Sequence, residues 1–127
     1  MSTVKIYLAS TIYTSEPGIS WKQRFTKEFD PDLYRFFDPD PINEPESYCI
    51  AKDKAEISNC DIFVAYIERP SFGTAMEIMY ASMLHTKPIM IIDPKGILMN
   101  DLWVSFHAHL ICSDVVDCAN HIKTMRF

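Results

Sequence analysis

The stretch DIFVAYI, residues 61–67, decides the fold of this chain. Almost all of its residues are apolar, which is expected of a central strand covered on both faces. A second buried strand is expected at KPIMIID (87–93). Shorter strands are expected at VKIYLA (4–9), LYRFFD (33–38) and LICS (110–113).

Helical segments separate these strands. They are expected at 19–29, 46–59 and 74–85, and a last helix follows Asp114, which can cap it, with Asp117 in the first turn. Strands that alternate with helices indicate a parallel sheet with right-handed crossovers. The sequence therefore predicts one α/β domain, residues 1–127: a flavodoxin-like, doubly wound three-layer sandwich with a five-stranded parallel sheet.

This topology predicts where a site would lie. In doubly wound sheets, ligands bind at the carboxyl ends of the strands, near the point where the strand order reverses. We therefore expect the loop after the first strand, residues 10–18, to lie beside the loop after the third strand, residues 68–73.

Composition and charge exclude several classes of protein. The net charge of -5 argues against binding to nucleic-acid polymers, which requires clustered Lys and Arg. No run approaches the roughly 18 apolar residues of a membrane span, and the polar start MSTVK is unlike a signal peptide. The four cysteines show no metal or CxxC spacing, and His107 and His109 do not share a helix face, so we expect reduced thiols, a cytoplasmic protein and no metal site.

The sequence around Gly73 could form an anion site. Glycines occur only at positions 18, 73 and 96, which excludes GxGxxG and P-loop motifs, and no GxSxG elbow is present. Ser71, Gly73 and Thr74 surround an expected helix start, where free N–H groups and the helix dipole favour an anion. The same field would favour Glu77, in the expected first turn, as a carboxylate. The alternative is that Ser71 only caps the helix and Glu77 is a solvated acid.

Two further residues suit glycosyl transfer. Asp53 lies on the helix before the central strand, and Tyr7 lies in the first strand, where its phenol can face a carboxylate on a neighbouring element. One carboxylate can attack an anomeric carbon while a second acid helps the base to leave or holds sugar hydroxyls.

The order of these motifs resembles the nucleoside 2-deoxyribosyltransferase family and its relatives, the 2'-deoxynucleoside 5'-monophosphate N-hydrolases. The matching segments, which cover about residues 4–93, are VKIYLAS, Asp53, NCDIFVAYI, PSFGTAMEI and KPIMII. The resemblance implies that Glu77 is a nucleophile forming a glycosyl-enzyme, that Tyr7 orients it, and that Asp53 is the second catalytic acid. It implies no metal or organic cofactor.

One position separates the branches of that family. Transferases acting on free nucleosides carry an Asp two residues before the loop glycine, whereas this chain has Ser71, as in the P-S-x-G of the monophosphate hydrolases. A hydroxyl suits a phosphate dianion, which a carboxylate would repel. This favours a 5'-monophosphate substrate. Ser10 and Thr11 could add phosphate contacts or be ordinary turn residues.

The remaining expectations concern the base and a second subunit. Tyr13, or Ile12 or Trp21, could stack on the base, although Tyr13 could equally be a surface or core residue. In the family a neighbouring subunit completes the site, which implies a homodimer or a higher homo-oligomer and a role for Asn100. The seven methionines fit a subunit interface or a pliable core.

Three functional hypotheses follow. The first is an enzyme acting through Glu77, either a hydrolase of a nucleoside 5'-monophosphate or a base-exchanging transferase on free nucleosides. The second is a nucleotide-binding sensor domain without turnover. The third is an interaction protein without a small-molecule site, which leaves the set of loop, acid and tyrosine unexplained.

Overall fold

A computed structural model describes residues 3–10, 20–39, 46–84 and 87–126 of the chain. Its centre is a five-stranded, all-parallel sheet with the strand order β2-β1-β3-β4-β5. The strands are β1 (Val4–Ser10), β2 (Tyr34–Phe37), β3 (Ile62–Tyr66), β4 (Ile89–Ile92) and β5 (Leu110–Cys112). This order confirms the predicted doubly wound, flavodoxin-like sheet.

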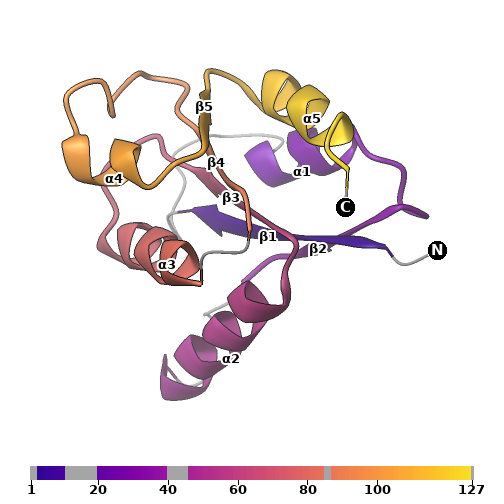
Figure 1. Cartoon of the computed structure of the whole chain (residues 1–127), viewed down its shortest axis with the longest axis horizontal. Coiled ribbons are helices and arrows are strands. Elements are labelled where there is room, and N and C mark those ends of the chain that lie inside the picture. Colours follow the sequence, from indigo (N-terminus) through magenta and orange to yellow (C-terminus); the bar gives the residue numbers. More distant parts are fainter. Residues whose placement is uncertain (1–2, 11–19, 40–45, 85–86, 127) are drawn as a thin grey trace.

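Helices cover both faces of the sheet and complete the three layers (Figure 1). They are α1 (Trp21–Thr26), α2 (Glu46–Asn59), α3 (Phe72–Met83), α4 (Leu102–Phe106) and α5 (Val115–Lys123). The predicted position of Asp114 as N-cap of the last helix is confirmed, because its side chain accepts a hydrogen bond from the N–H of Asp117. None of the described helices is long and apolar enough to cross a membrane.

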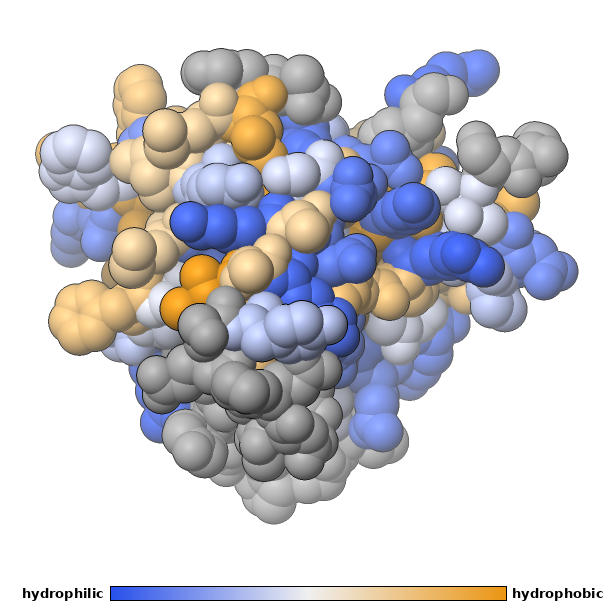
Figure 2. Space-filling model, turned by 90° about the horizontal axis from the view of Figure 1, so that it is seen from below, coloured by the Kyte–Doolittle hydropathy of each residue, from blue (hydrophilic) through white to orange (hydrophobic). Residues whose placement is uncertain are grey.

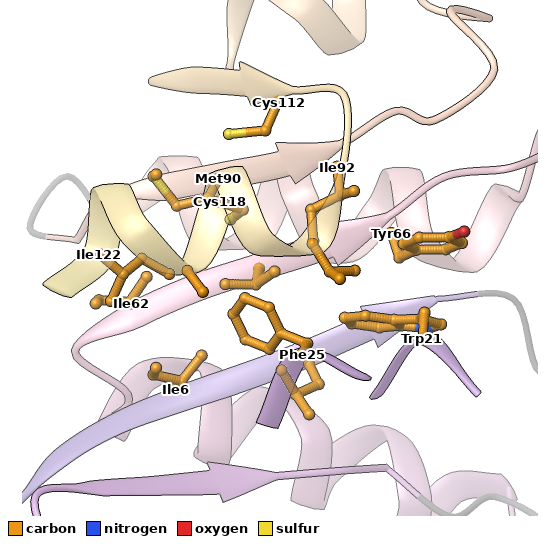
Figure 3. Close-up of a cluster of buried hydrophobic side chains, with 14 of the residues drawn as sticks. Ile6, Trp21, Phe25, Ile62, Tyr66, Met90, Ile92, Cys112, Cys118 and Ile122 are labelled. Carbon is orange, nitrogen blue, oxygen red and sulfur yellow. The ribbon is translucent and has the colours of Figure 1, made fainter. Parts of the chain in front are cut away.

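The alternation of side chains along each strand divides the core in two. On one face, residues such as Ile6, Val64 and Ile92 pack against α1 and α5, as Figure 3 shows for this cluster. On the other face, Tyr7, Phe63 and their neighbours pack on the side of α2 and α3. The central strand β3 is buried along its whole length, as the continuous apolar run predicts.

Three elements differ from the prediction. The helix expected over 19–29 is shorter, because α1 begins after its N-cap Ser20 and ends at Thr26. The helix expected over 74–85 begins two residues earlier, at Phe72, because Ser71 caps it. Helix α4 was not predicted. It is a short helix of five residues capped by Asp101, and none of its residues is buried, so it leaves no helical pattern of buried positions in the sequence.

The register of the sheet sets the position of the site. Tyr7 pairs with Phe63, and Ser10 pairs with Tyr66, so the carboxyl ends of β1 and β3 are adjacent. The strand order reverses between these two strands, because β1 lies between β2 and β3. The segments that follow β1 and β3 therefore start side by side, as predicted.

Candidate active site

Tyr7 is the buried residue around which the candidate site is built. It lies in β1 with its side chain fully inside the protein. Its ring stacks between Phe37 of β2 and Phe63 of β3, with a centroid separation of 5.4 Å in each case. Its hydroxyl group donates a hydrogen bond to Oε2 of Glu77. Two rings hold the phenol, so its hydroxyl is fixed in direction before any ligand binds.

Glu77 reaches Tyr7 because of its place on α3. It is three and four residues away from the buried residues Thr74 and Ala81, so it shares their face, which is turned toward the sheet. The expectation that Glu77 lies in the first helical turn is wrong. Helix α3 begins at Phe72 and has no acidic residue in its first turn.

The surroundings of Glu77 raise its pKa from the ordinary 4.5 to about 7. Burial is the largest cause, and the charge of Asp53 also raises the pKa; the hydrogen bond from Tyr7 and the charge of Lys22 lower it. We expected the helix dipole to favour the carboxylate form. That effect is confined to the first turn, and desolvation of Glu77 outweighs it.

The Tyr7 hydroxyl group is not suited to act as a nucleophile, because its surroundings oppose its ionisation. Burial, the charge of Glu77 and the hydrogen bond to Glu77 all raise the pKa of Tyr7 far above its ordinary value. Its hydroxyl group therefore stays protonated at neutral pH. It can act only as a hydrogen-bond donor to Glu77.

Asp53 belongs to the same electrostatic cluster. It lies half-buried on α2, which packs against both α3 and β1. Its charge raises the pKa of Glu77 and also that of Tyr7. Three residues that lie in separate parts of the sequence are therefore coupled in the folded chain.

The first residues of α3 form the candidate anion site. The Ser71 hydroxyl accepts a hydrogen bond from the N–H of Thr74 at 3.3 Å, which leaves its own proton free to donate. Phe72 and Gly73 are exposed, and among the described residues no atom outside the adjoining chain and the helix backbone lies within 4 Å of the position that a Cβ on Gly73 would occupy. Thr74 is different. It is buried at 2% exposure, and its hydroxyl has no hydrogen-bond partner among the described residues.

The other predicted residues that the structure describes are Ser10, Asn100 and Trp21. Ser10 is half-buried at the end of β1, and Asn100 is exposed before α4 and is not among the groups that act on Glu77. Trp21 is a core residue, because it is 2% exposed and stacks on Tyr66 at 4.9 Å (Figure 3). Thr11, Ile12 and Tyr13 lie outside the described residues.

Two charged residues near the carboxyl edge of the sheet were not predicted. Lys22 of α1 acts on Glu77, and Glu68, just after β3, is only 5% exposed with both carboxylate oxygens unpartnered within the described part of the chain. The sequence carries no signal for Lys22. In the sequence, Glu68 follows the buried central strand, at the edge of the sheet where a site is expected, and this position could have identified it.

Two further observations on the described residues concern metal binding and surface hollows. No three His, Cys, Asp or Glu side chains among them are grouped to hold a metal ion. A shallow hollow of about 730 Å³ lies along α1 and β2 and includes none of the predicted site residues. It is lined by Gln23, Thr26, Lys27, Phe29, Pro31, Tyr34, Arg35 and Phe36.

The solved structures with the same architecture include two proteins with a stated activity. One is a 2-deoxyribosyltransferase from the psychrotolerant bacterium Bacillus psychrosaccharolyticus, 22% identical, with a TM-score of 0.70 over 98% of this chain and 93% of that chain. The other is the CMP N-glycosidase of Clostridium botulinum, 18% identical, with a TM-score of 0.60 over 94% of this chain and 97% of that chain. No protein-family model matches the sequence, and no curated protein sequence matches it. Over nearly its whole described length, the chain therefore has the fold of a 2-deoxyribosyltransferase and of a CMP N-glycosidase.

Proposed function

We propose that the chain is an enzyme of the nucleoside 2-deoxyribosyltransferase family that cleaves the N-glycosidic bond of a (2'-deoxy)nucleoside 5'-monophosphate. The observation that carries the proposal is the hydrogen bond from Tyr7 to Glu77, near the point where the strand order of the sheet reverses. Two of the solved structures with this fold are a deoxyribosyltransferase and an N-glycosidase, which supports the same class of reaction here.

The reaction follows from the groups present. The Glu77 carboxylate attacks C1' of the sugar, and a C1'–O bond forms as the C1'–N bond breaks. The electron pair of the broken bond leaves with the base, which takes up a proton. Asp53, the second acid of the cluster, is the candidate to supply or relay that proton. Water then attacks C1' of the glycosyl ester, and a C1'–OH bond forms as the C1'–O bond to Glu77 breaks. The proton that water loses returns to the acid that protonated the base, and the sugar phosphate and the Glu77 carboxylate are released.

Tyr7 has a defined part in this sequence. Its hydroxyl hydrogen bond to Oε2 stabilises the carboxylate form of Glu77 and fixes the rotation of the carboxyl group. The other oxygen, Oε1, is then the one free to attack. Because Tyr7 remains protonated, it cannot compete with Glu77 as a nucleophile.

The preference for a 5'-monophosphate rests on the N-terminus of α3. The Ser71 hydroxyl can donate, and the helix offers its first N–H groups beside Gly73, around which the described residues leave space. A phosphate dianion is the ligand that this arrangement favours. The alternative is a free nucleoside with transfer to an incoming base, and a second alternative is a nucleotide sensor that binds without turnover.

A panel of substrates distinguishes these readings. Nucleosides and 5'-monophosphates, both ribo and deoxy, are incubated with the protein with and without a second base, and free base is followed by chromatography. We expect base release from a monophosphate without exchange. Exchange on free nucleosides would indicate the transferase, and binding without release from any substrate would indicate the sensor.

The role of Glu77 is tested in the same assay. Glu77→Gln keeps an acceptor for Tyr7 but removes the nucleophile, so we expect base release to fall at least about 1,000-fold. Glu28→Gln is the matched control, because Glu28 is also half-buried but lies at the end of α1 outside the cluster. Unchanged activity of Glu77→Gln would overturn the proposed mechanism.

We also propose that the chain forms a homodimer through the α3–α4 apolar surface. This surface consists of exposed side chains of α3, of α4 and of the turn before α4, namely Phe72, Met76, Met83, Met99, Leu102, Trp103 and Phe106. Figure 2 shows apolar side chains gathered on the left of the view, the side on which α3 and α4 lie in Figure 1. Apolar area of this kind is typical of a permanent interface.

A second copy of the chain is the occupant that fits the proposed reaction. Helix α3 carries both Glu77 and part of the α3–α4 apolar surface, so a partner seated there lies next to the site. Asn100 is exposed between Met99 and Leu102 of the same surface, from which it can reach the partner's site.

A further inference from the structure

The β4–α4 loop, residues 93–101, is fixed at both of its ends. It consists of turns and contains neither helix nor strand. At its start, the N–H of Asp93 donates to the carbonyl oxygen of Cys112 at 2.8 Å. At its end, the side chain of Asp101 caps α4 by accepting a hydrogen bond from the N–H of Val104. The loop is therefore a held connection between the sheet and α4.

The Asp93 carboxylate lies inside the β4–α4 loop and organises it. Asp93 is 8% exposed. Its Oδ1 accepts a hydrogen bond from the N–H of Ile97, and its Oδ2 accepts one from the N–H of Leu98, each at 3.0 Å. A buried carboxylate is costly unless donors satisfy it, and backbone N–H groups in a turn need acceptors in the same way. One side chain meets both needs, so the loop folds around Asp93.

Further contacts fix the middle of the β4–α4 loop and join it to α4. Gly96 has a φ of 67°, which glycine adopts without strain, and its carbonyl oxygen accepts from the N–H of Met99 at 3.3 Å. The Ser105 hydroxyl of α4 donates to the carbonyl oxygen of Leu98 at 3.2 Å. Leu98 is 7% exposed and belongs to the core on the side of α2 and α3. The loop and α4 therefore form one supported unit.

This supported unit turns apolar side chains toward solvent. Met99 and Leu102 are each 84% exposed, and Trp103 is 74% exposed. These residues belong to the α3–α4 apolar surface. An isolated chain gains no burial of apolar area from holding them in this way. A surface that is already ordered, however, loses less conformational entropy when a partner binds. A fixed backbone beneath exposed apolar side chains is therefore expected of a preformed docking surface.

We propose that Asp93 is a positioning residue that holds the β4–α4 loop in the shape that docks a second copy of the chain. The inference rests on the homodimer of the proposed function, because that partner is the one seated on the α3–α4 apolar surface. Asp93 acts through the loop, since its own side chain is buried. A purely structural role predicts a less stable monomer with unchanged dimer affinity. A positioning role predicts a weaker dimer.

The test compares dimer dissociation constants by sedimentation velocity. Asp93→Asn keeps the shape of the side chain, but its amide replaces one acceptor by a donor that faces a backbone N–H, so one loop hydrogen bond is lost. We expect the dimer to weaken at least about tenfold, because association then has to order the loop. Ser105→Ala, which removes only the hydrogen bond to Leu98, should weaken the dimer by a smaller factor.

Asp114→Ala is the matched control for a general loss of stability. Asp114 also accepts a backbone hydrogen bond, from the N–H of Asp117 at 2.8 Å, but it caps α5, which packs with α1 against the other core cluster. This variant should be less stable than the wild type and should keep the wild-type dimer constant. A dimer constant that is unchanged in folded Asp93→Asn would overturn the role of Asp93.

Hydrogen exchange tests the loop without any partner. In the dilute, monomeric protein, the amides of Ile97 and Leu98 should exchange at least about tenfold faster in Asp93→Asn than in the wild type, whereas amides of β3 should be unaffected. Exchange that is equally slow in both proteins would show that Asp93 does not hold the loop. That result would also overturn the proposal.

Base release separates this inference from the proposed function. The specific activity of Asp93→Asn should fall on dilution and recover at high protein concentration, where mass action restores the dimer. Activity that stays low at every concentration would contradict the positioning role. A weakened dimer in a protein that releases no base from any substrate would leave the role of Asp93 standing and overturn the proposed chemistry. An unweakened dimer that releases base would do the reverse.

Discussion

Glu77 meets two opposing demands. Its carboxyl group is held against Tyr7 near Asp53, where burial disfavours the charge, yet the proposed chemistry requires the charged form. Glu77 is therefore only partly ionised at neutral pH, because its pKa is about 7. A residue placed for reaction in this way carries a cost in stability, as is common at functional sites.

This cost can be measured as a pH dependence. The folded pKa of about 7 lies above the ordinary 4.5, so between these values the folded state holds a proton that the unfolded state has lost. The contribution of Glu77 to stability is therefore complete below 4.5 and is lost as the pH rises through 7. Above that pH, ionised Glu77 destabilises the fold relative to a neutral side chain.

We therefore expect Glu77→Gln to be more stable than the wild type at pH 8.5, by up to about 3 kcal/mol, and nearly equal to it at pH 4.5. Urea unfolding followed by circular dichroism at the two pH values measures the difference. Glu28→Gln is again the control. A stability difference that does not change with pH would contradict the electrostatic account of Glu77.

At the scale of the structural elements, the C-terminal end of α2 is held by a buried lysine side chain from another part of the chain. The buried Lys87, just before β4, donates from Nζ to the carbonyl oxygens of Ile57 at 2.8 Å, Ser58 at 2.9 Å and Cys60 at 2.9 Å. The last carbonyls of a helix have no partner within the helix, and a cation there also interacts favourably with the helix dipole. Lys87 therefore joins the end of α2 to the start of β4 and helps to set the position of the helix that carries Asp53.

Lys87→Met should lower the free energy of unfolding by roughly 2–4 kcal/mol, because three charge-assisted hydrogen bonds are lost and buried carbonyls remain unpaired. The measurement is a urea denaturation curve at pH 7. Lys95→Met, which changes an exposed lysine in the turn after β4, is the control and should cost little. Equal stability of the two variants would show that the Lys87 hydrogen bonds contribute nothing net.

At the scale of the whole molecule, exposed apolar side chains are concentrated on one side. The α3–α4 apolar surface gathers several of the most exposed apolar side chains, including Phe72 at 94% and Trp103 at 74% exposure. Single exposed apolar residues are normal, but a cluster on two contacting elements is not. The same side of the molecule carries the helix of Glu77, so assembly and activity are expected to depend on each other.

Trp103→Asp should shift the protein from dimer to monomer, because a charge in the centre of an apolar interface remains desolvated. Sedimentation velocity over a concentration series measures this change. Val116→Asp, at a position 46% exposed on α5, is the control and should remain dimeric. A wild type that is monomeric at all concentrations would contradict the proposed interface.

Much of the fold could be predicted from the sequence. The apolar run at residues 61–67 indicated a central strand, and strands alternating with helices indicated a parallel sheet, because both patterns reflect local burial. The short helix α4 could not be predicted, since its apolar residues face outward and leave no buried period. The predicted start of α3 lies two residues after the observed start, because the helical pattern alone does not show that Ser71 is the N-cap.

The sequence by itself determined the order of strands along the chain, the residues that form the core and the pairing of the segments after β1 and β3 at one edge. These depend on hydrophobic patterns and on the handedness of crossovers, which act over short distances along the chain. Only the tertiary structure decided that Tyr7 meets Glu77, 70 residues away, and that Lys22 acts on the same carboxyl group. The ionisation of Glu77 depends on burial, on the hydrogen bond from Tyr7 of β1 and on the charges of Asp53 of α2 and Lys22 of α1. These come together only when the sheet is complete.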